Sequence, residues 1–427
     1  MRVNRSLHPR RLVTVLSGVL LAIGAAVAQE PVEITITHTM TGGTHRVAFD
    51  QIIDAFHEEY PNIRVRQMPQ DMEIYQDVGL ISMLQSPNPP DIFFQWGGDL
   101  VRRDAELGFA ADLSDALDED GWGDTFLDAA WSESSGTMYD GRVYMIPYAF
   151  DVTTVLWYNV DMFEEHGLEE PETWGEFLDI VRTLREAGET PIILGNQQFW
   201  PLGNWAGHIT ARVVGMDLFD RALRLEEPFS QPAFEDAFER FAELAEANAF
   251  NRDLAGLGAS ESMTAFFQGA GAMHPIGSWL IPNALDTAPD DFRYGAFNTP
   301  EIPGGAGDPH SIIGLATGFQ VSAETPHFDE AITFLRFFTN MENQVAWAES
   351  GRFSPVRGAM AAADIDEHNQ QLAELFLDAE EMVPPPDTGY PVEVADIFYQ
   401  GAALVAGGLA SPTQGLAWID EQLSLLQ

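Results

Sequence analysis

The chain from residue 32 to residue 96 alternates between two hydrophobic periods, which predict the element order β-α-β-α-β. Residues 32–40 and 62–68 alternate apolar with polar side chains, as strands do, and residues 91–96 form a third, short apolar strand. Between them, residues 46–61 and 75–86 place apolar side chains on one helical stripe. This order predicts a parallel sheet with helices on its faces, and ligands of such sheets bind at the carboxyl ends of the strands.

The rest of the chain mixes extended segments with longer helices. Residues 141–163 indicate two extended segments broken at Pro147, and Thr173 and Glu176 predict a capping box at the start of a helix that ends at Gly188. Further along we expect a strand at 190–195, a loop at 196–208, helices at 232–250 and 261–273, strands within 310–323, a helix at 329–351, and closing helices interrupted by a proline-rich loop at 383–391.

Residues 1–28 have the pattern of a secretory signal peptide. A basic start precedes an apolar stretch from Leu12, which closes on the small residues Ala26 to Ala28. The alternative is a membrane anchor, but the stretch is short and interrupted by small polar residues, which favours cleavage. We therefore expect a mature chain that begins at Gln29 and works in the periplasm or outside the cell.

Composition narrows the possible partners. The chain has 427 residues, which predicts two domains, and it has no cysteine for a disulfide or for lipid attachment. Its 66 acidic residues face 21 basic ones, all of them arginine, and the formal net charge is −45. Such acidity excludes nucleic acid as a partner, because binding phosphates needs a basic surface. It indicates a saline habitat, where salt screens the self-repulsion of the chain.

Three long stretches carry a family resemblance by their order and spacing. They are "PPDIFFQWGGDLVRRDAELGFAADL", "GRVYMIPYAFDVTTVLWYNVDMF" and "FLRFFTNMENQVAWAESGRFSPVRG". The chain resembles the extracellular solute-binding proteins of ABC importers, in the sugar-binding group that includes maltose-binding protein. The missing cysteine departs from the many relatives that carry a lipid anchor.

The resemblance implies an α/β fold of the two-lobe periplasmic-binding-protein (Venus-flytrap) type, with hinge strands and the ligand in the cleft between the lobes. It implies crossings between the lobes near Pro147–Asp151, Ala296–Pro300 and Phe353–Pro355. The expected N-terminal lobe comprises residues 29–148 and 298–352, and the expected C-terminal lobe comprises residues 149–297 and 353–427.

Binding a sugar requires flat aromatic surfaces for its C–H face and fixed polar groups for its hydroxyls. Trp96 and Trp279 stand beside glycines and match aromatic sugar-stacking positions of the family. Trp200 matches a third position, with Phe199 as the alternative. The alternative for any tryptophan is core packing. We assign the tryptophans in helix-like or strand-like context to packing: Trp131, Trp157, Trp174, Trp347 and Trp418.

Polar candidates lie in the same loops. Asp151 resembles the acidic hinge contact of the family, with a hinge salt bridge as the alternative. Asp99 could accept sugar hydroxyls or only cap the next helix. The remaining candidate ligand-binding residues are Thr41, Gly42, Gly43, Thr44, Gln198, His310, Arg352 and Tyr390. The chain has no lysine and few arginines near these loops, which favours a neutral sugar over an anion.

These features predict a monomeric receptor that captures a neutral mono- or oligosaccharide and delivers it to the permease of an ABC transporter. The sequence has no G-x-S-x-G, H-E-x-x-H or P-loop motif, and residues 118–124 do not fit a calcium loop. We expect no enzyme activity, cofactor or metal. The alternatives are a receptor of the same fold for a polyamine or an organic acid, and a secreted glycoside hydrolase, because carboxylate pairs are abundant.

Overall fold

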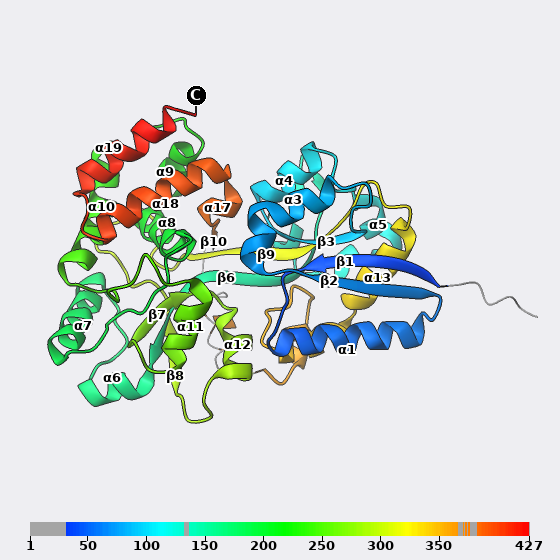
Figure 1. The fold of residues 1–427 in the computed structure, drawn as a ribbon, viewed down its shortest axis with the longest axis horizontal. Coiled ribbons are helices and arrows are strands. Elements are labelled where there is room, and N and C mark those ends of the chain that lie inside the picture. Colours follow the sequence, from blue (N-terminus) through cyan, green and yellow to red (C-terminus); the bar gives the residue numbers. More distant parts are fainter. Residues whose placement is uncertain are drawn as a thin grey trace, which may run out of the picture.

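The computed structural model describes residues 31–131, 136–365, 370, 372–373, 375 and 382–426. The expected signal peptide, residues 1–28, lies outside the described residues. Figure 1 shows two lobes on either side of long strands that run from one lobe to the other. In the described part of the chain, no helix is both long and apolar enough to cross a bilayer.

The first lobe confirms the predicted β-α-β-α-β order. β1 (Val32–His38) pairs in parallel with β2 (Ile63–Pro69) and β3 (Ile92–Trp96), and α1 (Thr44–Glu59) joins the first two strands. The expected helix at 75–86 begins earlier and is irregular, with α2 (Met72–Ile74), a π turn and α3 (Leu80–Leu84). This lobe also contains α4 (Asp99–Glu106), α5 (Ser114–Asp118), β4 (Met138–Tyr139), β5 (Arg142–Val143), α13 (Phe328–Phe338), α14 (Met341–Glu349) and α15 (Ala359–Ala362).

The two central strands are shared by both lobes. β6 (Ile146–Asn159) and β9 (Ile312–Val321) run antiparallel, and the far end of β9 pairs with β3 of the first lobe. The far end of β6 pairs with β7 (Met273–Ile276) and β8 (Tyr294–Phe297) in the second lobe. The two extended segments predicted here are β5 and β6, but the break between them lies at residues 144–145, just before β6 begins, and at Pro147 the pairing with β9 only shifts register.

The second lobe is mostly helical. The predicted capping box at Thr173 and Glu176 is present at the start of α7. The prediction of a loop at 196–208 is wrong from Trp200 onward, because a helix begins there. The strand expected at 190–195 is reduced to isolated bridges at Ile192. The helices are α6 (Val160–His166), α7 (Trp174–Ala187), α8 (Trp200–Val214), α9 (Met216–Leu223), α10 (Pro232–Glu246), α11 (Ala259–Phe267), α12 (Leu280–Thr287), α17 (Pro386–Gly389), α18 (Val392–Ala406) and α19 (Pro412–Leu423).

Two glycines of α8 explain why its sequence resembles a loop. A Cβ at Gly203 would lie 2.2 Å from the ring of Tyr399, and a Cβ at Gly207 would lie 2.9 Å from the ring of Pro386. These glycines therefore let α18 and the segment before it pack directly on the helix. Close packing, rather than a turn, is their physical role here.

The expected helix at 329–351 is divided into α13 and α14. Asn340 stands between them, and its side chain accepts a hydrogen bond from the backbone N–H of Asn343. This is an N-cap, which starts a new helix instead of continuing the first.

The structure moves two of the expected crossings. Residues 298–311 contact the second lobe: Trp205 Nε1 donates to Thr299 Oγ1 at 3.2 Å, and the N–H of Gly307 donates to the carbonyl of Arg212. The crossing expected near Ala296–Pro300 is therefore made by β9 instead. Phe353 and Pro355 both accept backbone hydrogen bonds from strands and loops of the first lobe, so the chain does not cross there either.

The last crossing comes after α15 and before β10 (Met382–Val383), which pairs with the second-lobe end of β9. Part of this stretch lies outside the described residues.

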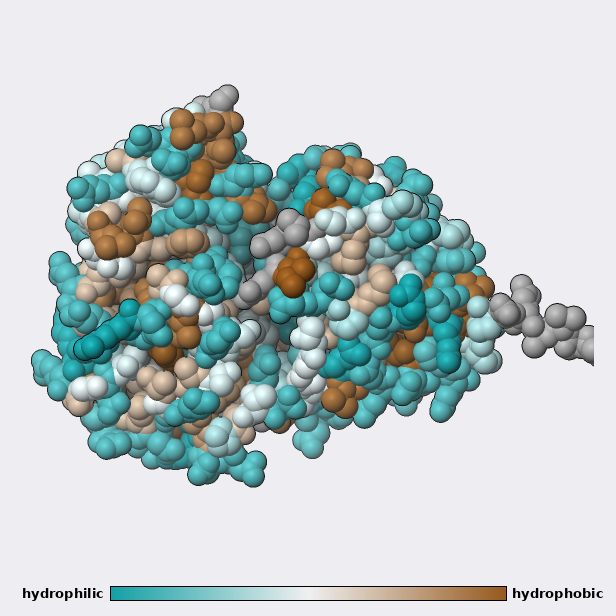
Figure 2. All heavy atoms as spheres, viewed as in Figure 1, coloured by the Kyte–Doolittle hydropathy of each residue, from teal (hydrophilic) through white to brown (hydrophobic). Residues whose placement is uncertain are grey.

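Each lobe has its own aromatic core. In the first lobe, Phe49, Phe338 and Trp347 meet at ring distances of 5.3–6.3 Å. Of the tryptophans assigned to packing, Trp157, Trp174 and Trp347 are fully buried, and Trp131 and Trp418 are partly buried against the cores. Hydrophilic residues cover most of the face in Figure 2 on both lobes, as the acidic composition predicts.

Candidate ligand-binding cleft

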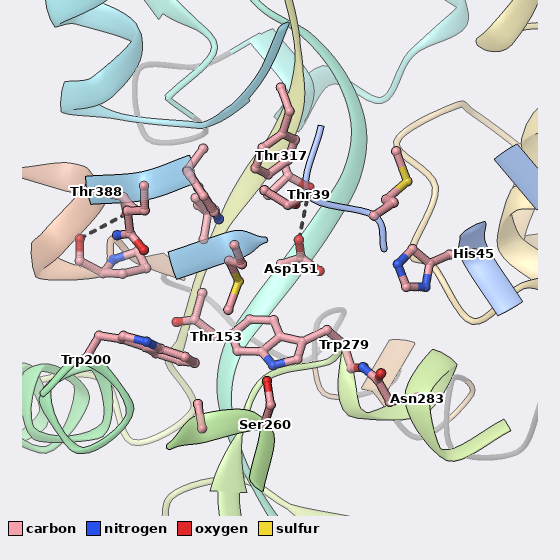
Figure 3. Close-up of a pocket in the computed structure, with 18 of the residues that line it drawn as sticks. Thr39, His45, Asp151, Thr153, Trp200, Ser260, Trp279, Asn283, Thr317 and Thr388 are labelled. Atoms are coloured by element: carbon pink, nitrogen blue, oxygen red, sulfur yellow. Dashed lines mark hydrogen bonds between the residues drawn. The ribbon is translucent and has the colours of Figure 1, made fainter. Parts of the chain in front are cut away.

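A cavity of about 330 Å³ lies between the lobes (Figure 3). From the first lobe it is lined by the segment after β1, by the start of α2 and by the end of β3. From the second lobe it is lined by the starts of α8, α11 and α12 and by the segment at 385–388, while β6 and β9 form its floor. The cavity thus lies at the carboxyl ends of β1 and β3, and its size suits a small molecule.

Three half-buried tryptophans line the cavity from both lobes. Trp96 ends β3, and its ring stands edge-to-face against Phe94 with 4.6 Å between the centroids. Trp200 begins α8, Trp279 precedes α12, and their rings lie 5.7 Å apart at 59° to one another. All three predicted aromatic residues are therefore brought together, as the apolar surfaces that a sugar face would need.

Asp151 holds the floor of the cleft together. Its carboxylate accepts hydrogen bonds from Ser278 Oγ of the second lobe at 3.0 Å and from Thr317 Oγ1 of β9 at 2.9 Å. It also pairs with Arg352 at 2.8 Å, and both side chains are more than nine-tenths buried. The salt bridge that the sequence left as the alternative is present, and both residues line the cavity.

Gly98, the second glycine after Trp96, lies directly against the second lobe. Gly98 has a φ of 102°, and a Cβ placed on it would lie 2.4 Å from the carbonyl oxygen of Thr388 in the second lobe. Asp99 lies in the first turn of α4 and pairs with Arg102 at 2.6 Å, away from the residues that line the cavity. The N-cap residue of α4 is Gly98 and no side-chain hydrogen bond caps this helix, so Asp99 neither lines the cavity nor acts as the expected cap.

The other predicted residues divide into two groups. Thr41 and Gly42 line the cavity, whereas Gly43 caps α1 and Thr44 donates to the carbonyl of Ser350. Tyr390 is buried in the second-lobe core, where its hydroxyl donates to Asp220 and Arg224 lies over its ring. Gln198 and His310 do not line the cavity either, and His310 is exposed.

The sequence reasoning missed several polar residues of the cleft. Among these are Thr39, His45, Thr153, Asn204, Ser260, Asn283, Thr317 and Asp387. Asn204 could have been found by treating residues 196–208 as a helix, because it lies one turn after Trp200. Thr39 and His45 flank the predicted segment at 41–44 and share its local signal, whereas the others depend on long-range packing.

His45 is neutral at physiological pH. Burial first, and then the charge of Arg352, lower its pKa to about 3. It can therefore donate or accept a hydrogen bond but brings no charge to the cleft. In the described part of the chain, no group of three His, Asp or Glu residues is placed to hold a metal ion.

The family model for bacterial extracellular solute-binding proteins matches residues 42–345. The chain belongs to this family. Among curated relatives, this solute-binding protein is 24% identical over 340 residues to an "Uncharacterized ABC transporter extracellular-binding protein" of Pyrococcus horikoshii, covering 78% of this chain and 72% of the relative. It is 29% identical over 203 residues to the "Multiple sugar-binding protein" of Streptococcus mutans, covering 46% and 47% of the two chains.

Solved structures support the same fold for this solute-binding protein. A chitin oligosaccharide binding protein matches with a TM-score of 0.82 at 23% identity, covering 92% of this chain and 98% of the other. A protein solved in complex with raffinose matches with a TM-score of 0.73 at 20% identity, covering 92% and 99%. The α/β two-lobe solute-binding fold predicted from the sequence is confirmed.

Proposed function

We propose that this protein is the secreted receptor of an ABC importer and binds a neutral mono- or oligosaccharide in the cleft. The observation that carries the proposal is the lining of the cavity: three tryptophans with hydroxyl and amide side chains between them. Among the described residues, Arg352 is the only arginine that lines the cavity, and Asp151 neutralises it. An anionic ligand would therefore find no free cation, whereas a sugar would find both kinds of surface that it needs.

The names of the relatives agree with this proposal. One curated relative is named as a multiple sugar-binding protein, and one structural neighbour is named as a chitin oligosaccharide binding protein. The shared strands β6 and β9 are the natural hinge, and closure about them would enclose the sugar before delivery to the permease. We propose a monomer without enzyme activity that works outside the cytoplasm.

A thermal-shift screen over mono- and oligosaccharides at high salt tests the proposal, because a ligand of the folded state raises Tm by mass action. We expect a neutral sugar to raise Tm, to compact the protein in small-angle X-ray scattering, and to remain chemically unchanged. A shift with spermidine or an organic acid but with no carbohydrate would contradict the proposal. Product formation from an oligosaccharide would instead favour the hydrolase.

The acidic composition supports a saline working environment as a second part of the proposal. With a formal net charge of −45, self-repulsion opposes the compact state, and salt screens it. We expect Tm to rise steadily with sodium chloride up to molar concentration. A Tm that is independent of salt would rule out this adaptation.

A further inference from the structure

Asp387 places an unused acceptor in the wall of the cleft. The residue lines the cavity although only 8% of its surface is exposed, and its Oδ1 atom has no hydrogen-bond partner among the described residues. A buried carboxylate oxygen without a partner destabilises the folded protein, because it has lost its water without a replacement. Such an atom at the edge of a binding cavity is satisfied when a ligand supplies the donor.

Packing fixes the position of Asp387. Its own N–H donates to the hydroxyl of Tyr399 at 3.0 Å, and that hydroxyl donates to Asn204 Oδ1 at 2.6 Å. Tyr399 in turn lies directly on α8 because position 203 is a glycine, and Pro386 does the same at Gly207. Asp387 and Asn204 are thereby tied into one rigid corner of the second-lobe wall.

This corner presents one acceptor and one donor. The Tyr399 hydroxyl occupies the carbonyl oxygen of Asn204, so the amide nitrogen is the group of Asn204 that is left for a ligand. Asp387 Oδ1 supplies the acceptor. A hydroxyl group both donates and accepts, so it can satisfy the two together, whereas an ammonium group can only donate.

An aromatic surface stands next to the corner. Trp200 precedes Asn204 by four residues on α8, so the two side chains lie on the same face of the helix, and both line the cavity. A ring of a sugar lying against the indole would carry its hydroxyls at the rim, toward this corner.

We propose that Asp387 and Asn204 bind one hydroxyl of the sugar ligand, with Asp387 as acceptor and Asn204 as donor, and that this corner selects the ligand. The inference rests on the proposed function and deepens it. It names a free hydroxyl, beside the sugar face that contacts Trp200, as the group that the receptor requires. Removal or methylation of that hydroxyl would leave both protein groups unpaired in the closed cleft.

Because Asp387 is buried, ligand binding at this corner should change its protonation. Burial, with a smaller contribution from the charge of Asp396, raises the pKa of Asp387 to about 7, although the nearby Tyr399 hydroxyl opposes the rise. Of the groups around Asp387, Tyr399 and Asp396 belong to α18. The uncharged Asn204 comes from α8, and the first lobe places the backbone of Gly98 beside the neighbouring Thr388. A ligand hydroxyl that donates to the carboxylate favours its ionised form, so binding near pH 6.5 should release a proton.

The experiment uses isothermal titration calorimetry of the full mature protein. The probe is whichever of D-xylose, L-arabinose, D-glucose, maltose and cellobiose binds the wild type most tightly. Titrations at pH 6.5 in phosphate and in imidazole, which both buffer at this pH but differ in ionisation enthalpy, count the protons released. Asp387→Asn keeps the shape of the side chain and removes the charge, and Asp99→Asn is the matched control outside the cleft.

We expect proton release by the wild type and by Asp99→Asn, and affinity that rises with pH up to about 7 in both. Asp387→Asn should bind the probe at least tenfold more weakly at pH 8 and release no proton, because it loses a charge-assisted hydrogen bond. Equal affinity of Asp387→Asn and wild type, or binding by the wild type without proton release, overturns the inference and leaves the proposed function intact. Failure of every sugar to bind the wild type overturns the proposed function, and the inference with it.

Discussion

The two walls of the cleft are built in different ways. The first-lobe wall consists of strand ends and the turns that follow them, such as Thr41 and Gly42 after β1 and Trp96 at the end of β3. The second-lobe wall consists of helix starts and a short helical segment brought together by tight packing, with Trp200 on α8 and Asp387 on α17. The first wall brings one tryptophan together with residues such as Thr39, His45 and Gln76, whereas the second brings two tryptophans and the unpaired carboxylate oxygen.

This difference suggests a division of labour. A ligand in the open protein would bind first to the second-lobe wall, which carries most of the aromatic surface and the polar corner. The first-lobe wall would then close over it, with Gly98 meeting Thr388 at the rim. Substitutions in the second wall should therefore change binding itself, and those in the first should change mainly closure.

A substitution in the floor that both walls share, Asp151→Ala, should have the largest effect on stability. Asp151→Ala leaves the buried guanidinium of Arg352 without its partner and frees Ser278 and Thr317 as well. We expect the free energy of unfolding to fall by about 3–5 kcal/mol, as for other broken buried ion pairs. Urea denaturation measures this change, with Asp99→Ala, which breaks the more exposed pair with Arg102, as the control. A loss below about 1 kcal/mol would show that the pair contributes little to the floor.

The unpaired carboxyl of the second wall should lower stability in a pH-dependent way. Burial raises the pKa of Asp387 from 3.8 to about 7, so between these values the folded state binds more protons than the unfolded state. The stability contribution of this group is therefore present below about pH 4 and is lost as the pH rises toward 7. The loss amounts to up to about 4 kcal/mol at 1.36 kcal/mol per pH unit.

Asp387→Asn has no such ionisation. In urea denaturation without ligand, the variant should match the wild type near pH 4 and exceed it in stability at pH 8. A variant that is less stable than the wild type at pH 8 would mean that the carboxylate has a partner in the folded protein and is not held for a ligand.

The sequence predicted the first wall better than the second, and the reason is physical. Strand ends and glycine turns are local, so the order of elements placed Thr41 and, together with the family resemblance, Trp96. The family resemblance then placed Trp200 and Trp279 in the cleft, although the helix that begins at Trp200 was expected to be a loop. Nothing local shows that Gly203 is a packing contact for Tyr399, which lies almost two hundred positions later.

The proline-rich segment at 383–391 shows the same limit. The sequence identified it as a contributor to the site but chose Tyr390, whose aromatic ring suggests sugar stacking. In the structure Tyr390 packs inward against Arg224, and Asp387 lines the cavity instead. Which residue of a short segment points inward depends on helices far away in sequence, and no periodicity records it.

Tryptophan substitutions compare the two walls directly. Trp200→Ala removes one of two neighbouring rings beside the polar corner, and we expect sugar affinity to fall about a hundredfold, or about 2.7 kcal/mol. Trp96→Ala removes the ring of the closing wall, and we expect a loss of about tenfold, or about 1.4 kcal/mol, with the fold intact. Titration calorimetry gives both affinities, and circular dichroism checks the fold. Larger losses for Trp96→Ala than for Trp200→Ala would reverse the proposed order of binding.

Gly98→Ala tests closure without touching the ligand. A Cβ at this position would lie 2.4 Å from Thr388 O, so the lobes should fail to meet at this rim, and the ligand-induced compaction seen by small-angle X-ray scattering should shrink. We expect affinity to fall a few-fold, because the second wall still binds the sugar. Gly108→Ala is the control for a substitution at positive φ: its φ is 71°, and nothing lies within 4 Å of the added Cβ. Gly98, at φ 102° and ψ −137°, also lies in a backbone region nearly restricted to glycine, so its substitution adds backbone strain to the clash. If both variants compact normally with the sugar, then Gly98 serves the turn after Trp96 alone, and the rim of the closed cleft must be sought elsewhere.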